Sequence, residues 1–208
     1  EMCIRDRGMT NFMKELKPDC LEDIIAGVSL YRPGPMDQIP RYIANKKDPE
    51  HAVYTHPALK PILKVTYGCM VYQEQVMQIV RDLAGYSLGR ADLVRRAMGK
   101  KKLDVMARER EIFINGQLDE DGNIVVPGCV RNGIDAESAN RIFDEMAEFA
   151  KYAFNKSHAA AYAVVSYRTA YLKAYYPAEF MAATLNSFLG NLDKIPDYIE
   201  ECRRLNIS

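Results

Sequence analysis

The sequence predicts a mainly α-helical protein that carries one small β-hairpin or irregular insertion around residues 117–130. The segment YQEQVMQIVRDL places Val76, Ile79, Val80 and Leu83 at helical spacing, and similar patterns recur along the chain. Hydrophobic residues make up 48% and charged residues 27% of the 208 residues, values typical of a globular protein. The helical pattern is interrupted over 117–133, where an Asp-Gly pair and an Ile-Val-Val run indicate a turn between short strands.

The first part of the chain is predicted to be two short helices that end at an abrupt turn. Pro33 and Pro35 fix their φ angles and lack amide donors, and Gly34 between them tolerates unusual backbone geometry. The turn therefore places Arg32 on a rigid loop. Residues 37–68 show no sustained periodicity, and we expect a loop with a short helix over 39–46.

Three helices are expected next, over residues 72–83, 88–98 and 103–115. Gly85 and Gly99 follow the first two as C-terminal stop signals. After the insertion, helix resumes at Asp135, which is a good N-cap residue.

A long helix is predicted in FNKSHAAAYAVVSYRTAYLKAYYP. Either Asn155 or Ser157 can cap its start, and it should end at Tyr176 because the residue before a proline disfavours helical geometry. Two further helices over 178–189 and 196–205 complete the expected fold.

Bulk properties exclude several classes of protein. The 28 basic residues cancel the 28 acidic ones, so any nucleic-acid site must be local. The five cysteines are scattered without a C-x-x-C pair, which argues against a zinc or redox site. No apolar run approaches the roughly 20 residues that cross a bilayer. We expect a cytoplasmic protein with reduced thiols and no membrane association.

The segment RADLVRRAMGKKK is a local basic site. Residues 90–110 hold eight Lys/Arg and three Asp/Glu, a local net charge of about +5. Arg95 and Arg96 lie near a helix end, and guanidinium groups suit bidentate phosphate contacts. A solvated basic helix end explains the composition equally well. The segment is not a Walker P-loop, because Val94 stands where that motif needs glycine and Lys101 where it needs Ser or Thr.

The helix that follows Asn155 carries a second candidate surface. His158 and Tyr162 are four residues apart and share a face, and the alanines at 159–161 would let a flat base approach. Tyr162 could stack on that base while Lys156 reaches phosphate. The competing interpretation is ordinary core packing of an Ala/Tyr stripe.

Other polar groups indicate surface rather than chemistry. His51 and His56 lack a Cys, Asp or Glu partner at ligand spacing, and the D-x-D at Asp119 lacks the glycine and closing glutamate of a calcium loop. The carboxylates of residues 144, 145 and 148 should lie on the solvent face of their helix, and no Ser-His-Asp or Cys-His arrangement stands out.

Three long motifs together resemble the fingers region of the bacterial DNA polymerase III alpha subunits, which are C-family replicative polymerases. They are RPGPMDQIPRYIANK, TYGCMVYQEQVMQIVRDLAGYSLGRADLVRRAMGKKK and FNKSHAAAYAVVSYRTAYLKAYYPAEFMAA. The similarity holds in order and spacing from about Gly8 to the end of the chain.

The resemblance implies template-directed DNA synthesis from deoxynucleoside triphosphates (dNTPs) with Mg²⁺, and it assigns residues to that task. The residues implied to bind dNTP and the nascent base pair are Arg95, Arg96, Lys100, Lys156, His158 and Tyr162. Those implied to line the cleft or contact DNA are Arg32, Tyr72, Gln73, Lys101, Lys102 and Asn155.

The sequence also departs from the family. The magnesium-binding carboxylates of the family lie in a palm domain upstream of this segment, so we expect no catalytic or metal residue here and no activity from this segment alone. We expect residues 1–7, EMCIRDR, to be a non-native scar and residues 8–208 to form one fingers domain. The family's helix-hairpin-helix and clamp-binding regions are also absent.

The implied partners are primer–template DNA, dNTP and the palm domain of the same subunit, with the sliding clamp and other replisome subunits bound through regions absent here. Two rival readings stay open on the residues alone. One is a non-catalytic helical module that binds the DNA backbone through the same lysines, and the other is a purely structural helical protein.

Overall fold

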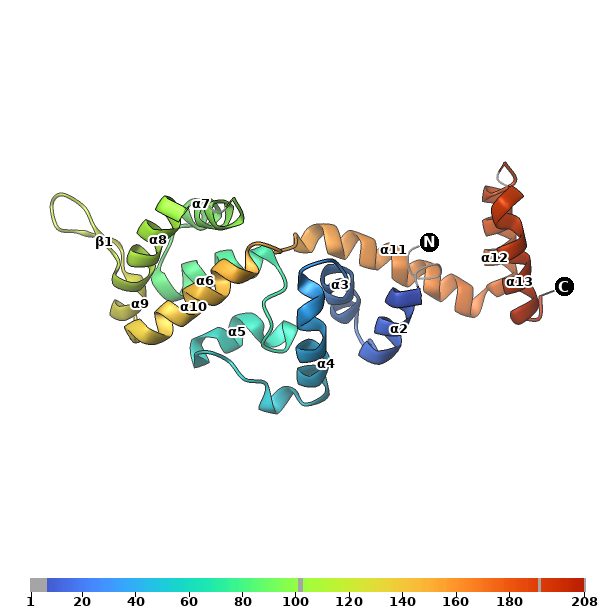
Figure 1. Cartoon of the computed structure of the whole chain (residues 1–208), viewed down its shortest axis with the longest axis horizontal. Coiled ribbons are helices and arrows are strands. Elements are labelled where there is room, and N and C mark those ends of the chain that lie inside the picture. The colour runs from blue at the N-terminus through green and yellow to red at the C-terminus, as the bar shows by residue number, and fades with distance from the viewer. Residues whose placement is uncertain (1–6, 101–102, 191, 208) are drawn as a thin grey trace. The chain divides into compact units, whose positions relative to one another are not determined.

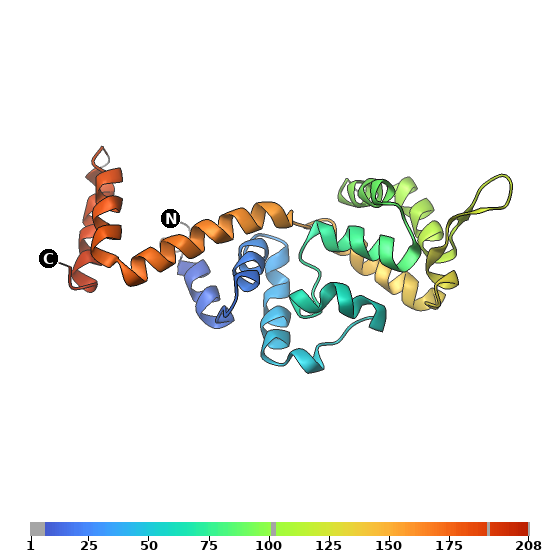
Figure 2. The ribbon, with the colours of Figure 1, turned by 180° about the vertical axis from the view of Figure 1, so that it is seen from behind.

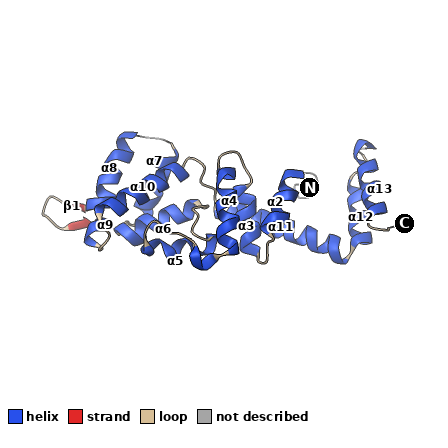
Figure 3. Cartoon of the chain, turned by 60° about the horizontal axis from the view of Figure 1, so that its bottom comes forward, coloured by secondary structure: helices blue, strands red, loops and turns tan. Residues whose placement is uncertain are grey.

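The computed structural model describes residues 7–100, 103–190 and 192–207. Helices dominate these residues and the only sheet among them has two short strands (Figure 3), which confirms the predicted fold class. The chain divides into two compact units at the peptide between Ala160 and Ala161. Six of the seven residues expected to be a scar lie outside the described part of the chain.

The first unit begins with the two predicted short helices, α2 (Arg7–Leu16) and α3 (Leu21–Leu30). The turn that follows contains Gly34 at φ 103°, in a region that favours glycine. A Cβ at this glycine would lie 2.3 Å from the ring of Tyr152, so the turn needs glycine for space as well. The chain then forms a 3₁₀ turn, η1 (Pro35–Gln38), and helix α4 (Ile39–Lys47), close to the predicted 39–46.

The segment expected to be loop contains more helix than predicted. Helix α5 (Lys60–Leu63) makes one turn, and the 3₁₀ turns η2 (Pro49–His51), η3 (Pro57–Leu59) and η4 (Lys64–Thr66) surround it. These turns are too short for a periodic pattern, yet they bury Leu59, Ile62 and Leu63.

The next three helices confirm the prediction. They are α6 (Gln73–Ala84), α7 (Leu88–Gly99) and α8 (Leu103–Asn115). Gly85 ends α6 in a left-handed conformation at φ 77°.

The predicted insertion is a small antiparallel hairpin followed by helix. Strands β1 (Gln117–Leu118) and β2 (Ile124–Val126) pair, and a one-turn helix, α9 (Gly128–Arg131), takes up the rest of the segment. Helix α10 (Ala136–Phe149) begins as expected at Asp135, whose Oδ1 accepts a hydrogen bond from the Ser138 amide at 2.8 Å.

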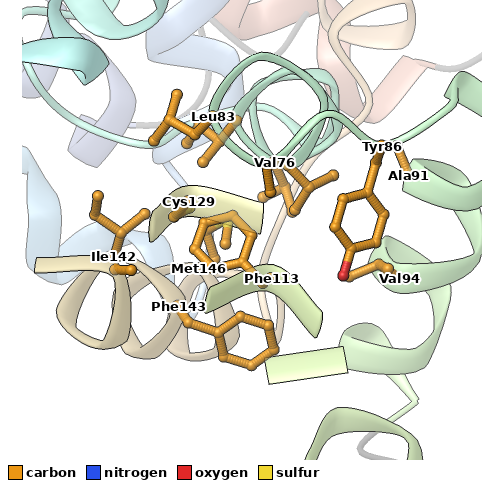
Figure 4. Packing of buried hydrophobic residues seen from close by; sticks show 14 of the residues in the cluster. Val76, Leu83, Tyr86, Ala91, Val94, Phe113, Cys129, Ile142, Phe143 and Met146 are labelled. Atoms are coloured by element: carbon orange, nitrogen blue, oxygen red, sulfur yellow. The ribbon is translucent and has the colours of Figure 1, made fainter. Parts of the chain in front are cut away.

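One hydrophobic core lies between helices α5 to α10 of the first unit. Figure 4 shows residues of α6, α8, α9 and α10 converging, and the rings of Phe113 and Phe143 lie 5.7 Å apart. Figures 1 and 2 show α8, α9 and α10 packed as neighbours from both sides, and α6 also contacts α8 and α9. The largest fully buried residues of this core are Leu59, Leu63, Val76, Ile79, Met98, Phe113, Ile142, Phe143 and Met146.

Helix α11 (Lys156–Tyr175) begins in the first unit and continues into the second. It stops one residue before the predicted end, and Pro177 opens α12 (Pro177–Ser187). After a 3₁₀ turn, η5 (Leu192–Lys194), helix α13 (Ile195–Arg204) packs against α12. No helix among the described residues is both long and apolar enough to cross a membrane.

Candidate functional site

Gln73, the first residue of α6, joins two segments that are far apart in sequence. Its backbone N–H donates to the carbonyl of Phe154 at 2.9 Å, and its side-chain Nε2 donates to the carbonyl of Ala153 at 3.0 Å. Tyr72 and Phe154 form an isolated parallel bridge beside these bonds. The short stretch that leads into α11 is therefore fixed against the start of α6.

Arg95 of α7 reaches the same glutamine. Its Nη1 donates to Gln73 Oε1 at 2.9 Å, while its Nε and Nη2 donate to Asp92 Oδ1 at 3.0 and 2.6 Å. One side-chain amide thus connects the basic end of α7 to the entrance of α11. The two sequence motifs predicted to act together do meet, through Gln73.

Arg96 shares the same carboxylate but lies further out. Its Nε is 2.7 Å from Asp92 Oδ2, and its side chain is 63% exposed, against 21% for Arg95. The hydrogen bond from Arg95 is the main reason that the pKa of Asp92 is lowered. Lys100 follows α7 and is exposed, whereas Lys101 and Lys102 lie outside the described residues.

The first turn of α11 is held by an amide and a carboxylate. Asn155 Oδ1 accepts from the His158 amide at 2.9 Å, so Asn155, and not Ser157, is the capping residue. The Glu74 carboxylate accepts from the Lys156 amide at 3.1 and 3.2 Å and from Asn155 Nδ2 at 3.2 Å. Because a helix N-terminus favours negative charge, Glu74 stabilises the start of α11.

The Lys156 side chain lies against a third carboxylate. Its Nζ donates to Glu22 Oε1 at 3.1 Å and lies 3.0 Å from Oε2, and it is 5.1 Å from the centre of the Tyr72 ring. Tyr72 is 1% exposed, and burial raises the pKa of its hydroxyl above the ordinary value. The structure places Tyr72 beneath Lys156 and not at the surface, so it contributes to the site by supporting that ammonium group.

Arg32 fixes the same entrance from another direction. Its guanidinium donates to the carbonyls of Ser29 and Tyr152 and lies 4.2 Å from the centre of the Phe154 ring. Burial lowers the pKa of Arg32, but an arginine stays charged at neutral pH. In this chain Arg32 anchors residues 152–154.

The two remaining predicted residues are both exposed. The edge of the His158 ring meets the Phe154 ring at a centroid distance of 5.4 Å. Tyr162 lies on α11 within the second unit and is 47% exposed. Neither side chain is a packed core residue.

Three carboxylates of this site, Glu22, Glu74 and Asp92, were not predicted from the sequence. Asp92 precedes Arg95 and Arg96 by three and four residues, a spacing that indicates contact on a helix. The net positive charge of the segment hides this pairing of Asp92 with the two arginines. Glu22 and Glu74 lie 134 and 82 residues from Lys156, and no local pattern marks them.

The described residues contain one candidate cluster for a metal ion, and it does not fit Mg²⁺. Asp19, Cys20 and Asp23 have ligand atoms close together, but Lys46 Nζ lies 2.9 Å from the Asp19 carboxylate and 3.0 Å from that of Asp23. The single ammonium group already pairs with both carboxylates, and a thiol is a poor ligand for a hard cation.

A cavity of about 330 Å³ lies near the Arg32 turn, but it is not part of this site. Gly34, Pro35, Phe149 and Tyr152 are among its lining residues, which do not include the residues implied to bind dNTP. Its size alone gives it no role, and the hydrogen-bonded network around Gln73 is the better candidate.

The other polar groups noted in the sequence are surface features, with one correction. His51 does have a carboxylate partner, since its Nδ1 lies 2.8 Å from Asp48 Oδ1, three residues earlier. Asp119 Oδ1 accepts from the amides of Asp121 and Asn123, which is a solvated turn as expected. The carboxylates at 144, 145 and 148 are exposed and bond to Arg110, Thr55 and Lys151.

Known proteins similar to this chain agree on one family. The family model described as "Bacterial DNA polymerase III alpha subunit finger domain" matches residues 4–121. The chain is 54% identical over 200 residues to DNA polymerase III subunit alpha of Xylella fastidiosa. It is 50% identical over 214 residues to that of Pasteurella multocida and 50% over 204 residues to that of Chlamydia trachomatis.

These alignments cover 96% to 98% of this chain but only 16% to 17% of each relative. The chain therefore corresponds to a minor part of a much longer polypeptide in those proteins. The family match includes the turn with Arg32, the start of α6 and all of α7, which carry much of the network described above. The chain belongs to the family of bacterial DNA polymerase III alpha subunit finger domains.

Proposed function

We propose that this chain is the part of a DNA-directed DNA polymerase that binds the incoming dNTP and the nascent base pair. The observation that carries the proposal is the bond from Arg95 to Gln73, because Gln73 also fixes the entrance of α11. Cations on α7 and at the start of α11 are thereby held around one residue. Such preorganised donors suit a polyphosphate, which gains charge-assisted hydrogen bonds from several directions.

Each residue has a distinct proposed part. Arg95, Arg96 and Lys156 bind the phosphates, with Lys100 nearby, and Arg32 and Asn155 keep the entrance of α11 in place. Exposed His158 and Tyr162 meet the base pair, where Tyr162 offers a stacking surface. The lysines at 101 and 102, which lie outside the described residues, are proposed to add positive charge for DNA or nucleotide binding.

Phosphoryl transfer itself is proposed to need residues outside this chain. Two Mg²⁺ ions would hold the attacking and leaving oxygens, and carboxylates of a palm domain would supply their ligands. The cluster at Asp19 is already paired with Lys46 and does not replace them. We therefore expect no templated primer extension from this chain alone, with primer–template DNA and the palm as partners in the complete subunit.

The complete subunit offers a direct test. Arg96→Ala should raise the KM for dNTP by about tenfold or more, because it removes a charged phosphate contact, while primer–template affinity stays nearly unchanged. Arg108→Ala is a matched control, since Arg108 is an exposed arginine of the same basic segment on α8.

An unchanged KM and turnover for Arg96→Ala would contradict the proposal. Loss of salt-dependent DNA binding without any effect on nucleotide use would instead favour a module that binds the DNA backbone.

A further inference from the structure

Three described cations of the proposed phosphate site, Arg95, Arg96 and Lys156, each contact a carboxylate of the same chain. Arg95 and Arg96 share Asp92, and Lys156 contacts both oxygens of Glu22. A carboxylate presents two acceptor oxygens to a guanidinium or ammonium group, as a phosphate does. The carboxylates of Asp92 and Glu22 thus hold the position at these cations that we propose for a phosphate.

We propose that Asp92 and Glu22 occupy these cations in the absence of nucleotide and release them when a polyphosphate binds. The two carboxylates would then act as internal competitors that lower the affinity of the site for polyphosphate. This inference rests on the proposed function and adds a competing internal ligand to the same site.

Asp92 can release the two arginines without disordering the rest of the site. Arg96 is largely exposed, and exposed ion pairs are weak because water screens them. Arg95 has a second anchor in Gln73 Oε1, which in turn is fixed to Ala153 through Nε2. When Asp92 is displaced, Arg95 therefore stays in position and Arg96 is free to follow the phosphate.

Glu22 has a comparable geometry at Lys156. The pair is partly exposed, with 33% of the lysine side chain and 40% of the glutamate side chain accessible. The Tyr72 ring beneath Nζ keeps the ammonium in place without the carboxylate. Glu22 also lies in the first turn of α3, where the helix N-terminus stabilises a carboxylate that has lost its partner.

Glu74 differs from these two residues. Its oxygens accept from the backbone amide of Lys156 and from the Asn155 side chain, so it holds the helix start and not a cation. A phosphate could not replace it without loosening α11. We assign Glu74 to positioning and exclude it from the exchange.

Competition of this kind distinguishes ligands by charge. A triphosphate offers more acceptor oxygens and more negative charge than pyrophosphate. Its contacts with the cations therefore offset the loss of two internal ion pairs more fully. Neutralising Asp92 should help both ligands, because a nearby negative charge also repels them. It should help the triphosphate at least as much as pyrophosphate, because the internal ion pair that must break is the same for both and Asp92 repels the more highly charged ligand more strongly.

The test uses the complete subunit bound to primer–template DNA, with inorganic triphosphate and pyrophosphate as probes. Asp92→Asn keeps the shape of the side chain and one acceptor oxygen but removes its charge. We expect it to tighten triphosphate binding about threefold to tenfold, and pyrophosphate binding by the same factor or less. Glu22→Gln should act in the same direction.

The controls separate competition from structure. Asp92→Glu restores the charge and should return both affinities toward those of the unmodified subunit. Asp82→Asn removes an exposed carboxylate that pairs with Arg81 on α6, outside the site, and should change neither affinity. In the double variant Asp92→Asn/Arg96→Ala, much of the gain in phosphate affinity should disappear, because that gain acts through Arg96.

The possible results test the inference and the proposed function separately. Weaker binding of both probes to Asp92→Asn, or unchanged binding, would overturn the inference, since Asp92 would then only position the arginines. If Arg96→Ala weakens triphosphate binding but Asp92→Asn does not strengthen it, only the inference fails. If Arg96→Ala has no effect on triphosphate, the proposed function itself fails.

Discussion

The two units of the chain differ sharply in how much apolar surface they bury. In the first unit, helices α5 to α10 enclose large side chains such as Phe113 and Phe143, which are less than 2% exposed. Among the described residues of the second unit, the apolar side chains that are buried are Ala163 and Met181. Helices α11 to α13 instead expose tyrosines and leucines, including a row at Tyr167, Tyr171 and Tyr175.

This difference indicates where the folding free energy comes from. Burial of apolar area is the main favourable contribution, and helices without tertiary packing are marginal in water. The first unit has its own core and should unfold cooperatively. The second unit has little of one, so its helices should depend on local interactions such as the Phe188–Tyr198 ring stack.

The largest effect is expected from a truncation in the core of the first unit. Phe143→Ala should lower the free energy of unfolding by about 3–5 kcal/mol, because it removes a buried ring and leaves a cavity. Tyr171→Ala, a similar truncation in the second unit, should cost less than about 1 kcal/mol, since that ring is exposed. Urea unfolding of the chain followed by circular dichroism measures both.

Equal costs for the two variants would contradict the comparison. Hydrogen exchange would sharpen it, because the amides of α6 and α10 should exchange more slowly than those of α12 and α13 if only the first unit has a cooperative core.

A smaller effect is expected at the start of α11, where a helix of the first unit leads into the second. Asn155→Ala removes the cap on the His158 amide and should cost about 1 kcal/mol. Ser157→Ala is the matched control and should be nearly neutral, because the structure gives the capping role to Asn155. The same unfolding experiment distinguishes them, and a larger loss for Ser157→Ala would show that the cap is wrongly assigned.

The last effect is confined to alkaline pH and to the first unit. Burial, together with Asp23, raises the pKa of Tyr67 to about 12 from its usual 10.0. Between these values the unfolded chain loses the phenolic proton while the folded chain keeps it, so stability should fall as pH rises from about 10 to 12. Tyr67→Phe should make that fall shallower in unfolding curves, and an unchanged slope would argue against a perturbed Tyr67.

Most of the fold was predictable because its signals are local. Periodicity located α6 to within one residue. Gly85 and Pro177 marked helix boundaries through their backbone chemistry, and Asp135 did so through its side-chain cap. The helical turns between residues 49 and 66 were missed, because one turn of helix has no period to detect. Their stability comes from burial against other helices.

The candidate site was predictable in part. Cations and a capped helix could be recognised as candidate phosphate-binding groups, and the structure brings Arg95 and Lys156 to the same segment through Gln73 and Tyr72. Their anionic partners were missed, since the contacts from Glu22 and Glu74 join residues far apart in sequence. Asp92 was missed because the net charge of a segment does not show which opposite charges within it form ion pairs.

The side-chain amide of Gln73 has a chemical consequence of its own. It is a directional dipole whose oxygen must face a donor, Arg95, and whose nitrogen must face an acceptor, the Ala153 carbonyl. Glutamate in its place would satisfy the arginine but repel the carbonyl, and lysine would do the reverse. Position 73 should therefore tolerate few other residues, because each of these substitutions keeps one of the two hydrogen bonds and breaks the other.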